Sequence, residues 1–175
     1  AWSLGQLAGL QKVEARVVLP GNAAAEGVHF DFTGTAAADV PDTVIAVKGK
    51  NQQGIVGTAL TDSLAVAVTD RFGNPIPGQT VNWSVPPGQG SVSASATTTG
   101  ADGRSAVLRI LGPTAGTQTA TATWPGHTPV VFTAQSGASG VSQIVKLFGD
   151  NQTAPAGQKL TDSIVVQAQD LNGNG

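Results

Sequence analysis

The sequence contains no cysteine among its 175 residues and only two histidines. The absence of thiols excludes a disulfide framework, a thiolate metal site and a cysteine nucleophile. Charged residues make up 11% of the chain, against roughly 25% in an average soluble protein. A formal net charge of −2 provides no electrostatic footprint for nucleic acid or an acidic membrane surface. No apolar run reaches the roughly 18 residues of a membrane span, so we expect no membrane insertion in this segment.

Glycine (23 residues) and proline (10 residues) are abundant, and 40% of the chain is hydrophobic, which is typical of a turn-rich β protein. Apolar residues alternate with neighbours of the opposite character, which predicts strands with one apolar and one polar face. The apolar members of four such runs are Leu64, Val66 and Val68; Val81, Trp83 and Val85; Ala106, Leu108 and Ile110; and Ala120, Ala122 and Trp124. No segment predicts a helix.

The chain also repeats itself, because residues 45–74 match residues 145–174 at an offset of 100. Twelve of these thirty positions are identical, among them Asp70, Gly73 and Asn74. The start of the chain matches its middle at an offset of 107, and the first copy carries seven extra residues around Leu19–Gly27. We therefore expect the C-terminal part of one repeat at 1–38, a complete repeat at 39–139 and the N-terminal part of the next at 140–175. The chain is then expected to be an excerpt of a longer array.

Turn signals separate the strands expected within the complete repeat. Asp70 to Pro75 and the dipeptide Pro77-Gly78 predict two successive turns, and Asp102-Gly103 predicts a hairpin. The strands are expected near 43–49, 62–70, 79–85, 91–99, 104–111, 116–124 and 129–135. Seven strands in about 100 residues indicate an all-β, immunoglobulin-like sandwich with Trp83 on the third strand and no disulfide behind it.

The run from Leu64 through Asp70, Gly73-Asn74-Pro75 and Pro77-Gly78 to Trp83 resembles the repeat of bacterial immunoglobulin-like domains of the invasin and intimin type. The later Asp102-Gly103 turn and the alternating threonines and alanines after residue 115 continue the pattern. The resemblance implies tandem repeats in a stiff stalk on secreted or cell-surface bacterial proteins, which holds an active tip away from the cell. Nothing in the chain resembles a receptor-binding tip.

The eleven carboxylates are scattered, and no pair is placed for glycoside hydrolysis. We expect Asp70 and Asp170 to accept hydrogen bonds from turn backbone amides. A calcium ligand is the alternative role for such residues, and Asp150 and Asp162 are the candidates at a domain junction, although no dense Asp-x-Asp run accompanies them. Both His29 and His127 are expected to be solvated. No Gly-x-Ser-x-Gly elbow is present, so neither an enzyme nor a cofactor is predicted.

The tryptophans bear on a sugar-binding role. Trp83 and Trp124 are in phase with the apolar faces of their strands, and Trp2 aligns with a position expected to point inward, so all three are expected in the core. Phe72 and Phe148 are better candidates for exposure.

Three functions remain open from the residues and the resemblance. The leading one is a non-enzymatic structural segment of a bacterial extracellular fibre or adhesin stalk, with neighbouring repeats of the same chain, and lateral or head-to-tail copies, as partners. A carbohydrate-binding or adhesive module of a secreted protein is the second. A filament subunit assembled by strand exchange is the third, but the two partial repeats together lack the counterparts of residues 76–101, which argues against it.

Overall fold

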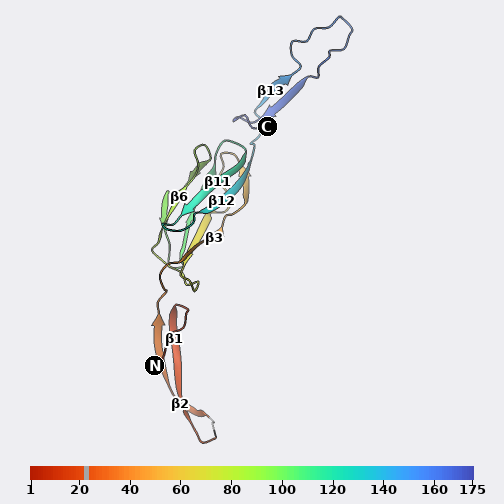
Figure 1. Ribbon diagram of the computed structural model, residues 1–175. Helices are drawn as coiled ribbons and strands as arrows, with labels where there is room; N and C mark the ends of the chain where they lie inside the picture. The colour runs from red at the N-terminus through yellow and green to blue at the C-terminus, as the bar shows by residue number, and fades with distance from the viewer. Residues whose placement is uncertain (22–23) are drawn as a thin grey trace.

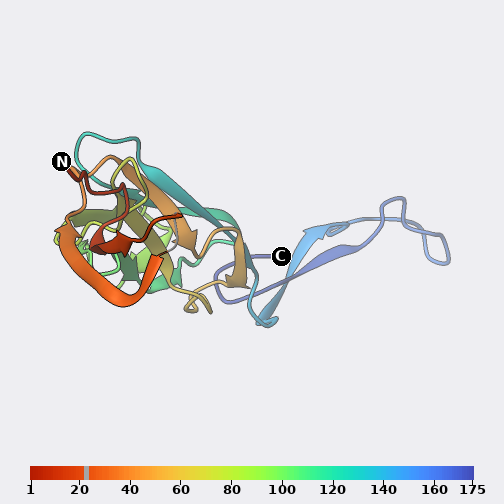
Figure 2. The same cartoon turned by 90° about the horizontal axis from the view of Figure 1, so that it is seen from below.

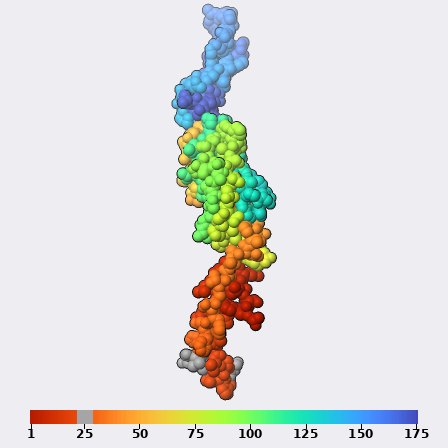
Figure 3. Space-filling view, turned by 90° about the vertical axis from the view of Figure 1, so that its left-hand side faces the viewer, coloured from red at the N-terminus to blue at the C-terminus, as the bar shows by residue number. Residues whose placement is uncertain are grey.

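The computed structural model describes residues 1–21 and 24–175, with side chains outside residues 22–28. Across these residues the chain forms an elongated array of a hairpin, a sandwich and a second hairpin (Figure 1, Figure 3). Figure 2 shows the second hairpin leaning away from the axis that the first two bodies share. No helix of the described chain is long and apolar enough to cross a membrane.

The strands run in chain order from one hairpin through the sandwich to the other. Their bounds are β1 (Gly9–Val18), β2 (Ala24–Ala36), β3 (Thr43–Lys48), β4 (Gln52–Ile55), β5 (Leu64–Thr69), β6 (Thr80–Ser84), β7 (Gly90–Val92), β8 (Ala96–Thr98), β9 (Arg104–Val107), β10 (Arg109–Leu111), β11 (Gly116–Thr123), β12 (Val130–Gly137), β13 (Gln143–Phe148) and β14 (Val165–Gln169). We call β1–β2 the N-terminal hairpin, β3–β12 the central sandwich and β13–β14 the C-terminal hairpin.

Two main sheets form the central sandwich. One has five strands in the order β4-β12-β11-β6-β8, and the other has three in the order β3-β5-β9. A short pair, β10-β7, completes it. All pairings are antiparallel except β4 with β12, which is parallel. The termini of the sandwich therefore lie at opposite ends of its long axis (Figure 1).

The core lies between the two main sheets. Val66, Val68, Val81 and Ala122 are each 0% exposed. Trp83 packs against Phe132 with ring centroids 5.9 Å apart, and its indole N–H donates to Thr97 Oγ1 at 2.7 Å. This hydrogen bond satisfies the one polar atom that the tryptophan brings into the interior.

The structure refines the expected strands in three places. Strand β4 is not among the expected strands, because its four residues, one of them a glycine, are too few to show an alternation of apolar and polar side chains. The expected strand 91–99 divides into β7 and β8, and the expected strand 104–111 divides into β9 and β10, since each half joins a different sheet. The hairpin expected at Asp102-Gly103 forms only in part. The outer halves of the two expected strands pair antiparallel as β7 and β10, but beside the turn β8 pairs with β6 and β9 pairs with β5, so the turn connects the two main sheets.

The buried face of residues 106–111 is the opposite of the one expected. Val107 and Arg109 are 3% and 2% exposed, whereas Leu108 and Ile110 are 59% and 45% exposed. Arg109 can be buried because its guanidinium donates to backbone carbonyls, including Ile110 O at 2.6 Å and Ser91 O at 3.2 Å. These acceptors replace the water that a buried cation loses.

The two hairpins are each only two strands and leave apolar side chains in solvent. Phe30 and Leu10 of the N-terminal hairpin and Ile164 beside the C-terminal hairpin are each 75% exposed. Trp2 does not point inward as expected: it is 43% exposed because no second sheet faces this hairpin among the described residues. Of the expected insertion at Leu19–Gly27, residues 24–27 belong to β2, and residues 22–23 lie outside the described residues.

Candidate functional site

The turn that follows β5 is organised by one carboxylate. Asp70 is 1% exposed, and its Oδ1 accepts the backbone N–H groups of Phe72 and Asn74, both at 2.9 Å. Its Oδ2 accepts the side-chain amide of Asn74 at 2.8 Å. Gly73 has φ +85°, a conformation that residues with a Cβ rarely adopt, and this lets the chain close the loop between the two residues. The carboxylate therefore fixes both the backbone and the side chain of Asn74.

The Asn74 amide also binds the segment that immediately precedes β1 of the N-terminal hairpin. Its Oδ1 accepts the Ala8 N–H at 2.8 Å, and its Nδ2 donates to Gln6 O at 2.8 Å. One side-chain amide thus binds a backbone donor and a backbone acceptor of a segment more than sixty residues away. We call this arrangement of Asp70, Asn74, Gln6 and Ala8 the first latch.

A second latch repeats this geometry at the other end of the central sandwich. Ala115 N–H donates to Asn174 Oδ1 at 2.8 Å, and Asn174 Nδ2 donates to Pro113 O at 2.8 Å and to Asp170 Oδ2 at 2.8 Å. Asp170 is 1% exposed. The same side chains, at the same spacings, therefore connect each body to the one before it.

The linker between the bodies is fixed by the same carboxylates. Asp70 Oδ2 also accepts the Asp39 N–H at 2.9 Å, and Asp170 Oδ2 accepts the Ser139 N–H at 3.0 Å. At the first junction, Arg71 forms an ion pair with Asp39 at 3.1 Å and lies 4.6 Å from the centre of the Phe72 ring. Each linker is thus attached to the turn that also holds the preceding body.

The hydrogen bonds determine the charge state of the latches. Burial alone would raise the pKa of Asp70, but the Asn74 amide and the N–H groups of Asp39, Asn74 and Phe72 favour the carboxylate and lower its pKa to about 2. The Asn174 amide is the main cause that holds the pKa of Asp170 below its usual range. Both latches are therefore built around a carboxylate that stays ionised at neutral pH.

The latch offers positioning rather than chemistry. Each oxygen of the Asp70 carboxylate accepts two hydrogen bonds within the latch and its linker. The described residues contain no group of three or more His, Asp or Glu side chains placed to hold a metal ion. What the arrangement can do is restrict the angle between consecutive bodies.

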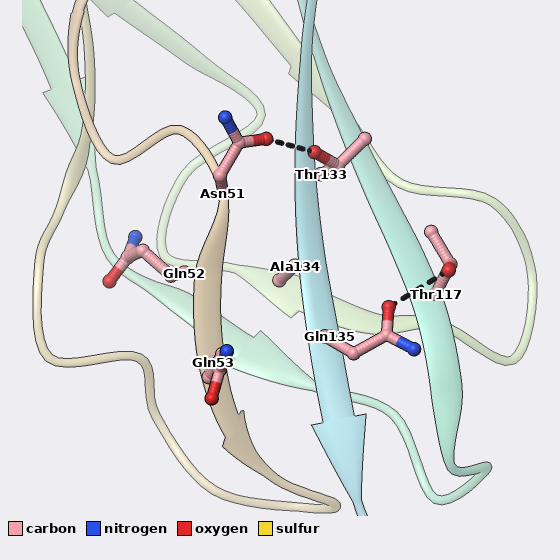
Figure 4. A pocket seen from close by; sticks show the side chains of 7 residues that line it. All are labelled: Asn51, Gln52, Gln53, Thr117, Thr133, Ala134 and Gln135. Carbon is pink, nitrogen blue, oxygen red and sulfur yellow. Dashed lines mark hydrogen bonds between the residues drawn. The ribbon is translucent and has the colours of Figure 1, made fainter.

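An open hollow of about 340 Å³ lies elsewhere, over β4, β11 and β12 (Figure 4). Amide and hydroxyl side chains line it, and two pairs are bonded to one another: Thr133 Oγ1 donates to Asn51 Oδ1 at 2.8 Å, and Thr117 Oγ1 donates to Gln135 Oε1 at 2.9 Å. The residues that line the hollow include no aromatic ring on which a sugar could stack.

The profile of the family described as "Bacterial Ig-like domain (group 1)" matches residues 46–136, which is more than half of the chain. The chain belongs to this bacterial Ig-like family. The expected all-β, immunoglobulin-like fold class is thereby confirmed.

Solved structures resemble this chain at low sequence identity. The Escherichia coli adhesin FdeC is 19% identical with a TM-score of 0.50, over 95% of this chain and 52% of that one. Domains 4–9 of the surface-layer protein SbsC are 21% identical with a TM-score of 0.44, over 98% of this chain and 30% of that one. A fragment of intimin in complex with the intimin-binding domain of its receptor is 17% identical with a TM-score of 0.42, over 70% of this chain and 40% of that one.

The chain spans between 23% and 59% of the length of the first structures that it matches. No curated protein sequence matches it significantly.

The remaining predicted site residues of the Ig-like sandwich lie in its core and turns. Trp83 is 3% and Trp124 is 7% exposed, and Trp124 stacks on His127 with centroids 3.8 Å apart. Pro75 forms an isolated bridge with Thr69, and the Gly78 N–H donates to Thr99 O at 2.9 Å, so Pro77-Gly78 lies where the chain crosses to β6. Asp102 is exposed and accepts the Arg104 N–H at 3.1 Å.

The two calcium candidates differ in their contacts. The Asp150 carboxylate is bonded to Lys146, and the backbone of Asp162 exchanges hydrogen bonds with the Gln152 side chain. Neither is among the residues that form a latch.

Sequence reasoning located Asp70 and Asn74 as turn residues but missed their partners in the preceding body. A signal was present, since Ala8 and Ala115, and Asn74 and Asn174, are identical pairs in the two repeat matches.

Proposed function

We propose that this chain is a structural segment of a bacterial extracellular or cell-surface stalk, in which successive Ig-like units are held in a restricted orientation by their latches. The observation that carries the proposal is the recurrence of one hydrogen-bonded geometry at both junctions, where each asparagine amide lies 2.8 Å from a backbone N and a backbone O at corresponding positions of the preceding body. A spacer needs restricted junctions, whereas an isolated binding module does not.

The proposal includes a division of the chain into units. Residues 1–38 and 140–175 are parts of further Ig-like units, and 39–139 is one whole unit. The exposed apolar faces of the two hairpins support this division, because the corresponding strands of the central sandwich bury theirs. Phe32 is 56% exposed, whereas Phe132, one hundred positions on, is 2% exposed.

The latch energies are sufficient to bias the orientation. Each intramolecular hydrogen bond contributes a net free energy of about 1 kcal/mol, so the two bonds from one asparagine contribute about 2 kcal/mol. Such a difference favours the closed junction over an open one by a factor of about 30. Charged residues are sparse in the chain, and no oxidative folding is needed, which suits a long exported protein.

The buried tryptophans argue against the carbohydrate-binding alternative. A sugar-binding sandwich presents aromatic rings to solvent, and Trp83 and Trp124 are buried instead. The phenylalanine at 148 is exposed at 57%, but it lies on the hairpin whose apolar face a neighbouring strand pair would cover.

Two measurements test the proposal. Electron microscopy of the native surface molecule is expected to show a linear fibre with a regular bead spacing, and a compact particle would contradict it. Spin-label distances between Lys12→Cys and Ser84→Cys then report the first junction, because the chain has no other cysteine.

The distance distribution is expected to be narrow and to broaden in Asn74→Ala. Asn82→Ala, at an exposed position of β6, is the matched control. A distribution that is equally broad in all three proteins would mean that the latch does not set the orientation.

A further inference from the structure

Strand β4 joins the start of the central sandwich to its end. It follows β3, the first strand of the sandwich, and it pairs in parallel with β12, the last. At the edge of the five-stranded sheet, β12 is its single neighbour in that sheet. We propose that the pair β4–β12 is a mechanical clamp that bears tension applied along the chain.

The direction of the strands determines how the clamp is loaded. Tension pulls the segment before β3 toward the N-terminal hairpin and the segment after β12 toward the C-terminal hairpin (Figure 1). Once β3 has slid from β5, the load reaches β4. Because β4 and β12 are parallel and are pulled in opposite directions along their common axis, all hydrogen bonds between them are sheared together. Bonds that are pulled at right angles to the strands would instead break one after another.

The clamp combines backbone and side-chain bonds. Four residue pairs are in register, from Ala134 opposite Gln52 to Gly137 opposite Ile55, and Val56 N–H donates to Gly137 O at 3.0 Å. The Thr133 hydroxyl extends the pair by one position through its 2.8 Å bond to Asn51 (Figure 4).

Each strand of the clamp is also anchored to the rest of the sandwich. The Gln52 side chain donates to Asp62 O and accepts the Asp62 N–H, both at 2.9 Å, and so attaches the start of β4 to the segment before β5. On the other side, the single proton of the buried Ser136 hydroxyl is shared between Gly116 O at 2.9 Å and Thr114 O at 3.0 Å. The load on the clamp is therefore transmitted to the core.

The anchor recurs in the next unit. Gln152 donates to Asp162 O at 3.0 Å and accepts the Asp162 N–H at 2.8 Å, and Asn151 has φ 58°, close to the 55° of Asn51. This inference rests on the proposed stalk function, because only a segment held at both ends carries tension.

Single-molecule force spectroscopy on the whole chain tests the clamp by comparing two pulling directions. End-to-end tethers shear β4–β12, whereas tethers at Gln53→Cys and Asn82→Cys, both on the same sheet, pull across it. A single protein carries both pairs of attachment points, so its stability is identical in the two measurements. We expect the sandwich to unfold at higher force end to end. An equal or lower force in that direction would overturn the proposal.

A pair of matched variants then assigns the resistance to the clamp. Thr133→Val removes the bond to Asn51, whereas Thr121→Val makes the same change on β11, where no bond of the hydroxyl occurs among the described side chains. We expect Thr133→Val to accelerate end-to-end unfolding at a fixed force about fivefold, the equivalent of about 1 kcal/mol for one hydrogen bond. Equal rates in the two variants would overturn the assignment.

The junction distances and the unfolding forces together distinguish a failure of the clamp from a failure of the stalk function. Asn74→Ala removes no bond between β4 and β12, so it is expected to broaden the junction distances while the sandwich still unfolds at higher force end to end than across the sheet. If the junction is unrestricted while shear resistance persists, the stalk function fails. If the junction is restricted but the two pulling directions give equal forces, the clamp fails.

Discussion

The carboxylate of Asp70 binds Asn74 twice, accepting its backbone N–H at 2.9 Å and its side-chain amide at 2.8 Å. The amide oxygen is thereby left to face the Ala8 N–H of the preceding body. An asparagine without this support would lose rotamer entropy on forming the same two cross-body bonds, whereas here the turn has already ordered it. The turn and the junction are therefore one structure.

Acid is expected to open the first junction. The pKa of Asp70 is lowered to about 2 in the folded chain, from an ordinary value near 4. A group with a depressed pKa stabilises the fold above its ordinary pKa, and this contribution is lost as the pH falls through the folded value. The distribution of distances between Lys12→Cys and Ser84→Cys should thus be narrow at pH 7 and should broaden between about pH 4 and pH 2.

The control for this titration is a neutral variant. Asp70→Asn removes the ionised acceptor, so its distribution should already be broad at pH 7 and should change little in acid. Asp62→Asn, which loses only an exposed ion pair with Lys48, should behave as the parent does. If Asp70→Asn keeps the acid response of the parent, another group causes it.

The sequence predicted the sandwich because period-two alternation and turn residues are local signals. It located Asp70 and Asn74 for the same reason, since their spacing is that of a turn. The cross-body partners Gln6 and Ala8 contribute only backbone atoms, and backbone atoms have no side-chain signature. The buried face of residues 106–111 was predicted wrongly because the prediction considered only which side chains are apolar. The carbonyl acceptors that permit a buried Arg109 guanidinium are backbone atoms and have no signal in the local pattern.

Neutralising Arg109 is expected to destabilise the central sandwich. In Arg109→Met, the carbonyl groups of Ser91 and Ile110 lose a charged donor that lies in a part-buried site. Losing such bonds should lower the free energy of unfolding by about 3 kcal/mol, measured by urea denaturation. Arg104→Met, whose side chain is 62% exposed in the parent, should change it by less than about 0.5 kcal/mol. Equal effects at the two positions would mean that the buried bonds contribute no net stability.

A methyl group at Gly103 is expected to cost more than one at Gly126. Both glycines have positive φ, +70° and +81°, so alanine is strained at each by about 1 kcal/mol. At Gly103 a Cβ would also lie 2.7 Å from Val68 O and 3.0 Å from Ile76 N, whereas nothing lies within 4 Å at Gly126. Thermal denaturation should therefore show a clearly larger loss for Gly103→Ala. Equal losses would show that the backbone at Val68 and Ile76 can move away from Gly103 without cost.

Replacing Asn74 by aspartate is expected to reverse the direction of the pH response. Asn74→Asp removes the amide donor to Gln6 and places a second carboxylate beside Asp70, so at pH 7 the two negative charges repel and the junction should open. As the pH falls, one proton shared by the pair removes the repulsion and restores a donor. The distances should then narrow in acid before they broaden again, whereas those of the parent only broaden. A variant that stays open at every pH would show that the Nδ2 bond to Gln6 is essential, and one that stays closed at pH 7 would contradict the role of the latch.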